Sequence, residues 1–573
     1  MQISLESNIP YSHNLSINNH VYSYTLSWNN KNVTKDSRIT FSWETPLKDI
    51  FYRWYPGMKD SRGIIADWDE DALTESFIAT NAPMICFYNQ KGENKHTVAI
   101  SEFKKLTYMN FGVNEKAATL HCHITLPLLQ FANAGTTETI FQIRIDEVPK
   151  PLETAIDEVS QWWESFLTVA KAPEYASDTF YSFWYSYHQD INPEVVEREC
   201  RAAQALGIKA VIVDDGWQTI DNNGGYAFCG DWKPLKFPDM KEHVARVHAM
   251  GLKYILWYSV PFLGLKAESY PIFKDKTLFE TRGAAVLDPR YKEVREYLIG
   301  TYETALREWD LDGFKLDFID EFVNENNIHA NDSMDIKDLS DAVFTLMTDI
   351  RTRLKKIKES VVIEFRQTYI GPAMRSYGDF FRVGDCPNDL MKNRWNSVDL
   401  RLLCRNTPIH SDMLMWHREE TVENCALQII NALFSVLQIS VKLEEQTQEQ
   451  KKMLYFWLDF VKENKPLLLH SPLKVHDMQC LYTLVEGVGA EEKLSAVFVP
   501  DKCVTVDKPK VILVNGTQND TILAEFDGQY TCEILDCMGE KFGSFEAKSA
   551  GIFRIPVPSA GIMVAKKEKK IKE

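Results

Sequence analysis

The sequence predicts a multidomain α/β protein, in which a central (β/α)8 TIM barrel is flanked by an N-terminal β-sandwich and a small C-terminal antiparallel β domain. Three observations predict this architecture. Short alternating segments fill the first part of the chain, strands then alternate with long helices, and the helices disappear towards the end. At 573 residues the chain also exceeds what one hydrophobic core normally serves.

Alternation of apolar and polar residues indicates the N-terminal sandwich. Segments such as 21–26 and 118–124 alternate with period two and are separated by turns rich in Asn, Gly and Pro. Residues 152–169 then carry apolar side chains at helical spacing, which predicts a helical bridge into the next domain. We therefore assign residues 1–172 to a β-sandwich with a helical linker.

The barrel is predicted from repeated strand–helix units. Asn192 and Pro193 are typical of a helix start, Gly207 of a helix end, and residues 209–213 follow as a strand. Helix 239–250 precedes strand 252–258, and a helix opening at Asp288–Pro289 precedes strand 313–318. Residues 173–470 provide room for eight such units. A doubly wound open sheet is the alternative, but neither GxGxxG nor a P-loop follows a predicted strand.

The last part of the chain reads as a separate β domain. Segments 494–499, 511–514 and 552–555 are short apolar runs of the kind found in strands, and no helical pattern separates them. We therefore assign residues 471–573 to a C-terminal antiparallel β domain.

Charge and cysteine content exclude several classes of partner. The 81 acidic and 64 basic side chains give a net charge of −17, which would repel a phosphate backbone, so we expect no nucleic-acid partner. The 11 cysteines form no CxxC pair and fit small buried hydrophobes in a reducing compartment. The first residues lack a signal-peptide pattern and no membrane-length apolar run occurs, so we expect a cytoplasmic protein without a membrane partner.

Carboxylates end three of the predicted barrel strands. Asp214 and Asp215 follow strand 209–213, Asp317 ends strand 313–318, and Asp385 follows Arg382. In a TIM barrel the reactive groups lie at these strand ends. Alternation turns Lys315 and Asp317 to one side of their strand, towards the barrel mouth.

Two carboxyl groups in different surroundings suit cleavage of a glycosidic bond. The ammonium group of Lys315 favours an ionised Asp317, whereas a carboxyl in a drier place keeps its proton for general acid catalysis. In the retaining mechanism two such groups stand about 5–5.5 Å apart. A lone Lys-x-Asp is more often a salt bridge, but three acidic strand ends favour a catalytic site.

Tryptophans near the predicted strand ends are candidates for stacking on a sugar ring. They are Trp184, Trp217, Trp232 and Trp257. Each of them taken singly is more typical of a core residue.

Several stretches together resemble the α-galactosidases and raffinose-synthase-like enzymes of glycoside hydrolase family 36, in the clan that also contains family 27. They are Val213–Gln218, Gly230–Trp232 with Lys236–Pro238, Gly251–Lys253 with Trp257, Leu287–Pro289, and Lys315–Asp317. The resemblance implies a retaining exo-hydrolase that forms a covalent glycosyl-aspartate and acts on a small-molecule or oligosaccharide α-galactoside. It also implies the three-domain architecture.

The resemblance also implies roles for individual residues. Asp317 is similar to the family's nucleophile and Asp385 to its acid/base. Asp214 and Asp215 are similar to the pair that binds the axial 4-hydroxyl and the 6-hydroxyl of galactose. The remaining expected substrate-binding residues are Lys315 and Arg382 for neighbouring hydroxyls, Trp257 and Trp184 for the sugar-binding wall, and Arg366.

The sequence departs from the family pattern in two places. Ile319 replaces the usual Asn two residues after the nucleophile, and residues 366–372 replace a Cys-Ser-x-Gly-Gly stretch. In the family that stretch shapes the pocket around the sugar's 2-position. The glycone therefore stays open, with α-N-acetylgalactosamine as one alternative, and Asp389 is a rival to Asp385. The chain is also shorter than many relatives, so a homo-oligomer stays open as well.

The sequence leaves four other functions to compare with a retaining hydrolase. Transglycosylation of the raffinose-synthase type uses the same covalent intermediate, and a silent sugar-binding protein has no need of two opposed carboxyl groups. A metal-dependent hydrolase would draw on His121 and His123, which lie in the predicted sandwich. Three consecutive residues, His410, Ser411 and Asp412, cannot converge on one atom as a catalytic triad. We expect His410 and Asp412 to line the barrel mouth near a late strand or to cap the next helix. We expect no metal and no cofactor.

Overall fold

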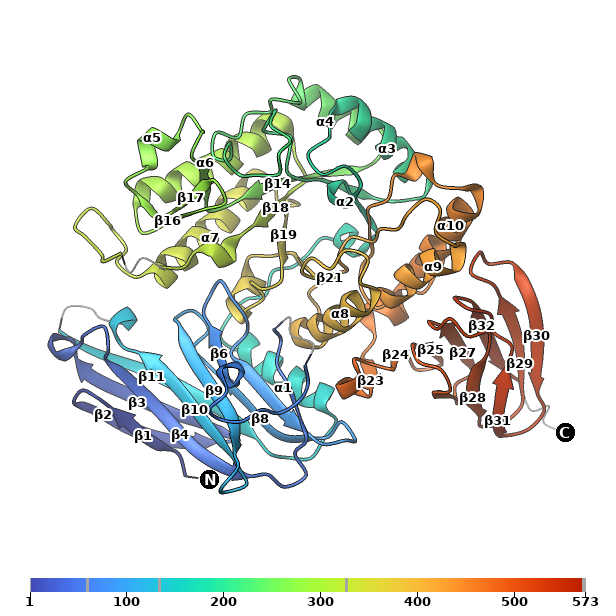
Figure 1. Ribbon diagram of the computed structural model, residues 1–573, viewed down its shortest axis with the longest axis horizontal. Helices are drawn as coiled ribbons and strands as arrows, with labels where there is room; N and C mark the ends of the chain where they lie inside the picture. Colours follow the sequence, from blue (N-terminus) through green and yellow to red (C-terminus); the bar gives the residue numbers. More distant parts are fainter. Residues whose placement is uncertain (1, 58–60, 132–134, 325–327, 569–573) are drawn as a thin grey trace. The chain divides into compact units, whose positions relative to one another are not determined.

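The computed structural model describes residues 2–57, 61–131, 135–324 and 328–568 (Figure 1). The chain divides into two compact units. Unit 1 consists of Met1–Lys171, Gln218–Leu235 and Trp257–Phe381, and unit 2 consists of Ala172–Trp217, Lys236–Leu256 and Arg382–Glu573.

Two antiparallel sheets form the predicted sandwich at the start of unit 1 (Figure 1). The first has the order β1-β4-β10-β9-β6: Ser4–Ser7, Arg38–Pro46, Thr119–Pro127, Thr107–Asn114 and Leu73–Ser76. The second has the order β2-β3-β11-β8-β7-β5: Tyr11–Asn18, Val21–Asn29, Thr136–Asp146, Asn94–Ile100, Met84–Tyr88 and Tyr52–Trp54.

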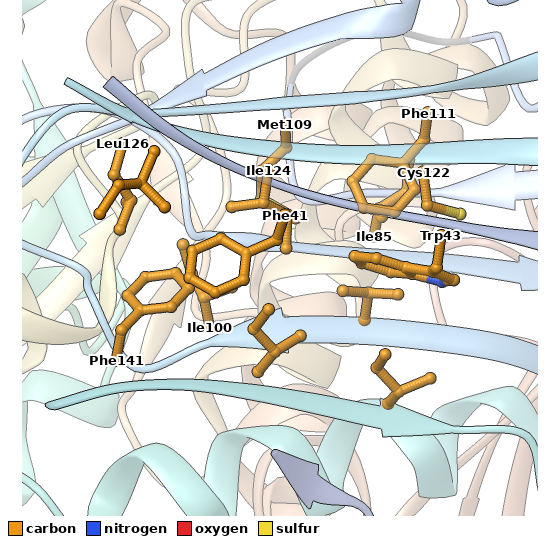
Figure 2. Packing of buried hydrophobic residues seen from close by; sticks show 14 of the residues in the cluster. Phe41, Trp43, Ile85, Ile100, Met109, Phe111, Cys122, Ile124, Leu126 and Phe141 are labelled. Atoms are coloured by element: carbon orange, nitrogen blue, oxygen red, sulfur yellow. The ribbon is translucent and has the colours of Figure 1, made fainter. Parts of the chain in front are cut away.

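Alternating side chains from both sheets form one hydrophobic core (Figure 2). Phe41 of β4 stacks on Phe141 of β11, with ring centroids 5.0 Å apart, and both rings are buried. The period of two predicted for residues 118–124 is confirmed on β10, where Leu120, Cys122 and Ile124 are buried and the residues between them are partly exposed. Strand β11 also has a buried and an exposed side, with Ile143 buried and Ile140 66% exposed.

The predicted helical bridge is helix α1, Leu152–Glu164. Its apolar face is buried, and the indole N–H of Trp163 donates to the carbonyl of Ile100 on β8 at 2.9 Å. This bond anchors the helix to the sandwich that precedes it.

The central sheet is the predicted parallel barrel. Its eight strands have the order β21-β20-β19-β18-β14-β13-β12-β22. In chain order they are Phe180–Ser182, Ala210–Val213, Lys253–Ser259, Gly313–Asp317, Val362–Arg366, Phe380–Arg382, Ile409–His410 and Gln438–Ile439. A parallel bridge between His410 and Val436 joins β21 to the segment before β22, which itself pairs with β12, and this closes the ring.

Helices connect these strands as the βα repeat predicts. The helices longer than one turn are α3 Pro193–Ala205, α4 Met240–Ala249, α6 Lys292–Trp309, α7 Leu339–Ile357, α8 Leu390–Cys404, α9 Val422–Asn431 and α10 Gln448–Glu463. Asn192 caps α3 by accepting from the backbone N–H of Val195 at 2.9 Å, as its position predicts. A small sheet, β15-β17-β16, lies between β14 and α6 in sequence and contains Phe262–Gly264, Ala284–Leu287 and Thr277–Thr281.

One helix start differs from the prediction. Helix α6 begins at Lys292 and not directly after Asp288–Pro289. Asp288 is buried and accepts from the Arg290 backbone N–H at 3.0 Å and from its guanidinium at 2.8–3.1 Å. This local pairing turns the chain before Tyr291, and the helix starts only afterwards.

Two sheets form the C-terminal β domain. The larger has the order β23-β24-β25-β27-β32-β29-β30: Leu473–His476, Leu484–Val488, Glu492–Val497, Lys510–Asn515, Ile562–Lys567, Tyr530–Leu535 and Lys541–Ala547. The smaller contains β26 Cys503–Val506, β28 Ile522–Phe526 and β31 Gly551–Ile555. Most pairs are antiparallel as expected, but β25–β27 and β26–β28 run parallel. In the described part of the chain no helix is long and apolar enough to cross a bilayer.

Replacement of Ile143 by Ala tests the sandwich core. We expect it to lower the free energy of unfolding by about 2–5 kcal/mol, because it removes buried methyl groups and leaves a cavity. Ile140→Ala, on the exposed side of the same strand, is the matched control and should change this free energy by no more than about 0.5 kcal/mol. Urea denaturation followed by tryptophan fluorescence measures both. Equal losses for the two variants would contradict the facing assigned to β11.

Candidate active site

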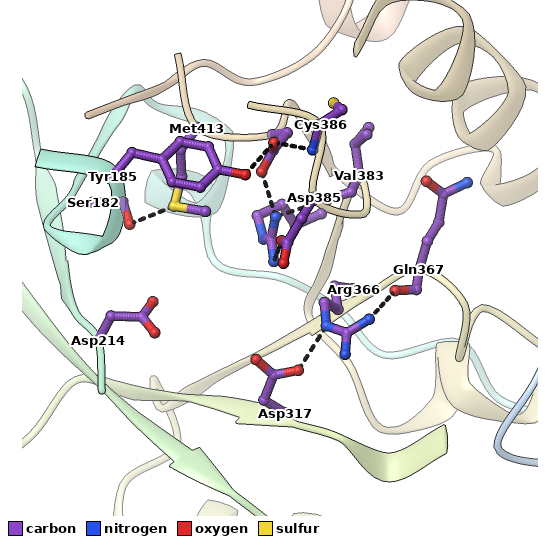
Figure 3. A network of polar contacts seen from close by, with 12 residues as sticks. Ser182, Tyr185, Asp214, Asp317, Arg366, Gln367, Val383, Asp385, Cys386 and Met413 are labelled. Atoms are coloured by element: carbon purple, nitrogen blue, oxygen red, sulfur yellow. Dashed lines mark hydrogen bonds and ion pairs between the residues drawn. The ribbon is translucent and has the colours of Figure 1, made fainter. Parts of the chain in front are cut away.

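In unit 1, Asp317 ends strand β18 and is almost fully buried. Its Oδ1 accepts from Arg366 Nε at 2.7 Å, from the Tyr369 hydroxyl at 2.9 Å and from the Phe318 backbone N–H at 2.9 Å. Its Oδ2 accepts from Trp257 Nε1 at 3.1 Å. Figure 3 shows Arg366 reaching over to Asp317. Four donors, one of them a guanidinium, favour the ionised form of this carboxyl.

The backbone conformation after β18 supplies one of these donors. Phe318 has φ 63°, in the left-handed region, so its N–H turns back to the Asp317 side chain. Phe314, on the opposite side of the strand, packs against Tyr302 of α6, with ring centroids 5.7 Å apart. Phe314 therefore faces the covering helix, while Asp317, three residues on, faces its hydrogen-bond donors, as the alternation predicts. The direction of Lys315 stays a prediction.

Tyr369 remains a hydrogen-bond donor to the nucleophile candidate. Burial, and secondarily the negative charge of Asp317, raise the pKa of its hydroxyl well above the ordinary value. The tyrosine is therefore neutral at all ordinary pH values and keeps its proton to donate to Asp317.

A second carboxyl group, Asp320, lies close to this cluster. Its Oδ2 accepts from the Thr368 hydroxyl at 3.2 Å and lies 3.8 Å from Arg366 Nη1. Burial raises the pKa of Asp320; Arg366 opposes this rise and Asp317 adds to it. Arg366 is thus placed between two acidic groups.

Aromatic rings surround Trp257. Its ring lies 6.4 Å from that of Tyr226 and 6.0 Å from that of Trp232, and Tyr226 also contacts Phe318 at 5.1 Å. Trp257 and Trp232 are buried, as is Trp217, so these tryptophans pack into the protein as the alternative interpretation predicts. A contact of Trp257 with sugar stays a prediction.

In unit 2, Arg382 joins two carboxylates. It donates from Nη1 to Asp412 Oδ1 at 2.5 Å and pairs through Nη2 with Asp385 Oδ1 at 2.9 Å. The side chains of Arg382 and Asp412 are buried, whereas that of Asp385 is 56% exposed. Asp389, the rival acid, caps helix α8 by accepting from the Lys392 backbone N–H at 2.9 Å. Of these two carboxyls, Asp389 therefore already serves as a helix cap.

Asp214 and Asp215 follow strand β13 in the same unit, and both are buried. Gln189 Nε2 donates to Asp215 Oδ2 at 2.7 Å, and Asp214 Oδ1 accepts from the Asp215 backbone N–H at 3.1 Å. Gly216 has φ +116°, and a Cβ there would lie 2.7 Å from the Gln189 Cα, so only glycine fits after the pair.

Trp184 lies in the short helix α2, Trp184–Tyr187. Its ring lies against that of His188, with centroids 4.5 Å apart and ring planes tilted by 36°. A sugar contact by this residue remains a prediction.

The sequence-predicted residues are found in both units. Unit 1 holds Lys315, Asp317, Trp257 and Arg366, and unit 2 holds Asp214, Asp215, Arg382, Asp385 and Trp184. Arg366, expected as a substrate-binding residue, contacts Asp317, Asp320 and the carbonyl of Gln367.

Three residues at these clusters have no role in the sequence prediction: Tyr369, Asp320 and Tyr185. Asp412, expected near the mouth after a late strand or as a helix cap, lies two residues beyond β21 and binds Arg382. No local sequence pattern marks the two tyrosines.

His121 of the sandwich is held by acidic neighbours. Its Nδ1 lies 3.0 Å from Asp67 and its Nε2 3.2 Å from Glu44. Cys122, between the two histidines, faces the core. Across the described ranges no group of three or more His, Cys, Asp or Glu side chains is arranged to hold a metal ion.

Comparison with known sequences matches part of the chain. The family model described as Melibiase matches residues 154–368. The chain is 26% identical to alpha-galactosidase 2 of Pediococcus pentosaceus over 191 residues, which is 32% of this chain and 26% of the relative. It is 28% identical to alpha-galactosidase AgaA of Geobacillus stearothermophilus over 145 residues, 22% of this chain and 20% of the relative. The aligned regions thus span about a quarter or less of these relatives.

Comparison with solved structures covers nearly the whole chain. The family 36 α-galactosidase AgaA of Geobacillus stearothermophilus matches with a TM-score of 0.64 at 14% identity, over 96% of this chain and 79% of the other. The α-galactosidase of Lactobacillus brevis matches with a TM-score of 0.65 at 13% identity, over 100% and 86%. At these identities the likeness shows a common fold.

The partial family match, the curated relatives and the shared fold agree with the motifs at the strand ends. Over part of its length the chain is therefore similar to the Melibiase family and to curated α-galactosidases, and it shares the fold of solved family 36 α-galactosidases.

Proposed function

We propose that the protein is a retaining, exo-acting α-galactosidase with Asp317 as nucleophile and Asp385 as acid/base. The observation that carries the proposal is the set of four hydrogen bonds on Asp317. A nucleophilic carboxylate must be ionised and oriented, and these donors favour both. Asp385, by contrast, is 56% exposed, so it is accessible to a leaving group and to water.

The reaction would proceed in two displacements. Asp317 attacks the anomeric carbon while the bond to the leaving oxygen breaks and Asp385 gives that oxygen its proton. Water then gives a proton to Asp385 and its oxygen attacks the same carbon, which releases Asp317. Each step inverts the configuration, so the net result is retention.

We propose that Asp214 and Asp215 select galactose by binding its hydroxyl groups. Both are buried carboxylates directly after β13, and Gln189 orients the second of them. A buried acceptor that relies on a sugar hydroxyl rejects sugars whose hydroxyl points elsewhere, because the acceptor is then left unpaired. Lys315, Arg382, Trp184 and Trp257 would complete the sugar site.

Relatives support galactosides as the substrate class. The Geobacillus stearothermophilus enzyme AgaA has been solved in complexes with 1-deoxygalactonojirimycin, stachyose and raffinose. We propose an α-galactoside, either a small molecule or an oligosaccharide, for this chain too. Transfer to a sugar hydroxyl would use the same covalent intermediate and would appear as a longer saccharide in the same assay. A cytoplasmic site of action and a homo-oligomer stay predictions.

A different glycone is the second candidate, because residues 366–372 replace the family's stretch that shapes the pocket around the sugar's 2-position. The guanidinium of Arg366, at the start of this segment, lies against Asp317, the proposed nucleophile. α-N-Acetylgalactosaminides belong in the same substrate panel for that reason. A sugar-binding protein without turnover is disfavoured by the presence of both Asp317 and Asp385.

Azide rescue of two alanine variants separates the roles of the two carboxyls. With an activated aryl α-galactoside, Asp317→Ala should lose turnover, and azide should then give the β-galactosyl azide by a single inversion. Asp385→Ala is the matched variant and should give the α-galactosyl azide, because azide replaces water in the second step. NMR of the products identifies each anomer. Full activity of Asp317→Ala, or the same anomer from both variants, would reject these roles.

Arg366→Gln tests the electrostatic support of the nucleophile. Loss of the guanidinium raises the proton affinity of Asp317, so the ionised form should need a higher pH. We expect the acidic limb of the kcat/KM profile to move up by about 1 pH unit. Arg353→Gln is the control, since Arg353 of α7 pairs with Glu296 and Glu303 on α6. If the acidic limb stays in place in Arg366→Gln, or moves equally in the control, Arg366 does not stabilise the ionised form of Asp317.

A further inference from the structure

Asp412 is a fully buried carboxylate that the proposed reaction does not use. It lies just after β21 and accepts three hydrogen bonds within unit 2. Arg382 Nη1 donates to Oδ1 at 2.5 Å, and Oδ2 accepts from the Tyr185 hydroxyl at 2.9 Å and from the Cys386 backbone N–H at 2.7 Å. Hydrogen bonds to this buried carboxylate hold each of the three donor groups in one orientation.

Arg382 transmits the orientation to Asp385. Its guanidinium donates to the carbonyl of Val383 at 2.9 Å and pairs with Asp412 and Asp385 through different nitrogens. Asp412 therefore fixes one edge of the guanidinium, and the other edge faces the acid/base candidate. The Cys386 N–H bond fixes the backbone directly after Asp385 in the same way.

We propose that Asp412 is a positioning residue for Asp385: it holds Arg382 in place and offsets the guanidinium charge, so that Asp385 can keep a proton for the leaving group. The inference rests on the proposed function. Without Asp412, a full positive charge 2.9 Å from Asp385 would favour its ionised form, which cannot act as a general acid.

The other groups around the cluster carry little charge that could replace Asp412. Burial raises the pKa values of Tyr185 and Cys386 far above their ordinary values, so both are neutral. Burial lowers the pKa of His410 to about 3, so this ring is neutral as well. The carboxylate of Asp389 accepts a hydrogen bond from the Lys392 backbone N–H as the cap of α8.

Burial and hydrogen-bond donors act in opposite directions on the protonation of Asp412. Burial raises its pKa, and the guanidinium of Arg382 opposes that rise. Protonation would also cost it a donor at Oδ2, where the Tyr185 hydroxyl and the Cys386 N–H both point. Three donors on its two oxygens, one of them a guanidinium, favour the ionised form of Asp412.

Asp412→Asn tests the proposal because it keeps the shape and removes the charge. Carbodiimide-mediated amidation of Asp385, followed by peptide mass spectrometry across a pH series, reports when this exposed carboxyl is protonated and needs no substrate. We expect the midpoint of labelling to fall by about 1 pH unit in Asp412→Asn. The alkaline limb of kcat/KM on an aryl α-galactoside should fall with it. Tyr185→Phe is the matched control, since it removes one donor and keeps the charge, and should shift the midpoint less.

An unchanged labelling midpoint in a folded Asp412→Asn overturns the proposal, even if activity falls. If Asp412→Asn does not unfold cooperatively, Arg382→Gln is measured in its place. The proposal requires the pH midpoint of Asp385 labelling to rise in Arg382→Gln. An unchanged midpoint overturns it. Failure of the proposed function looks different. In that case the wild-type protein turns over no aryl α-galactoside, while the labelling result is unaffected.

Discussion

The hydrogen bonds on Asp317 are the interaction on which the rest of the site depends. Three of the donors come from neighbouring parts of unit 1: Trp257 from β14, Arg366 from the end of β19, and Tyr369 just beyond it. The fourth is the backbone N–H of Phe318, which needs a left-handed residue directly after β18. Holding one carboxylate in this way requires parallel strands to end at the same level, and a barrel provides that arrangement.

The general architecture was readable from the sequence because it depends on local signals. Asn192 and Pro193 begin α3 as predicted, and the predicted alternation on β10 buries Leu120 and Ile124. Carboxylates at strand ends were also readable, because strand ends need only hydrophobic runs and their boundaries. Asp214, Asp317 and Asp385 all follow or end the predicted strands.

The sequence did not show which side chains contact one another in the folded protein. Arg366 was expected to bind substrate, yet its guanidinium binds Asp317, and Asp412 was separated from Arg382 by 30 residues of sequence. Nothing in a local pattern says that Tyr185 of a one-turn helix donates to Asp412. The start of α6 was predicted too early because Arg290 folds back onto Asp288, a contact that competes with the helix.

The two carboxylate clusters differ in a way that suits two roles. Asp317 is buried under donors, whereas Asp385 is exposed and shares its arginine with a second carboxylate. The central claim is that these groups act in a double displacement on an α-galactoside. NMR of the first-formed sugar during hydrolysis of an aryl α-galactoside tests it most directly. The account predicts α-galactose as the first product, before mutarotation. First-formed β-galactose would mean a single displacement and would contradict the account.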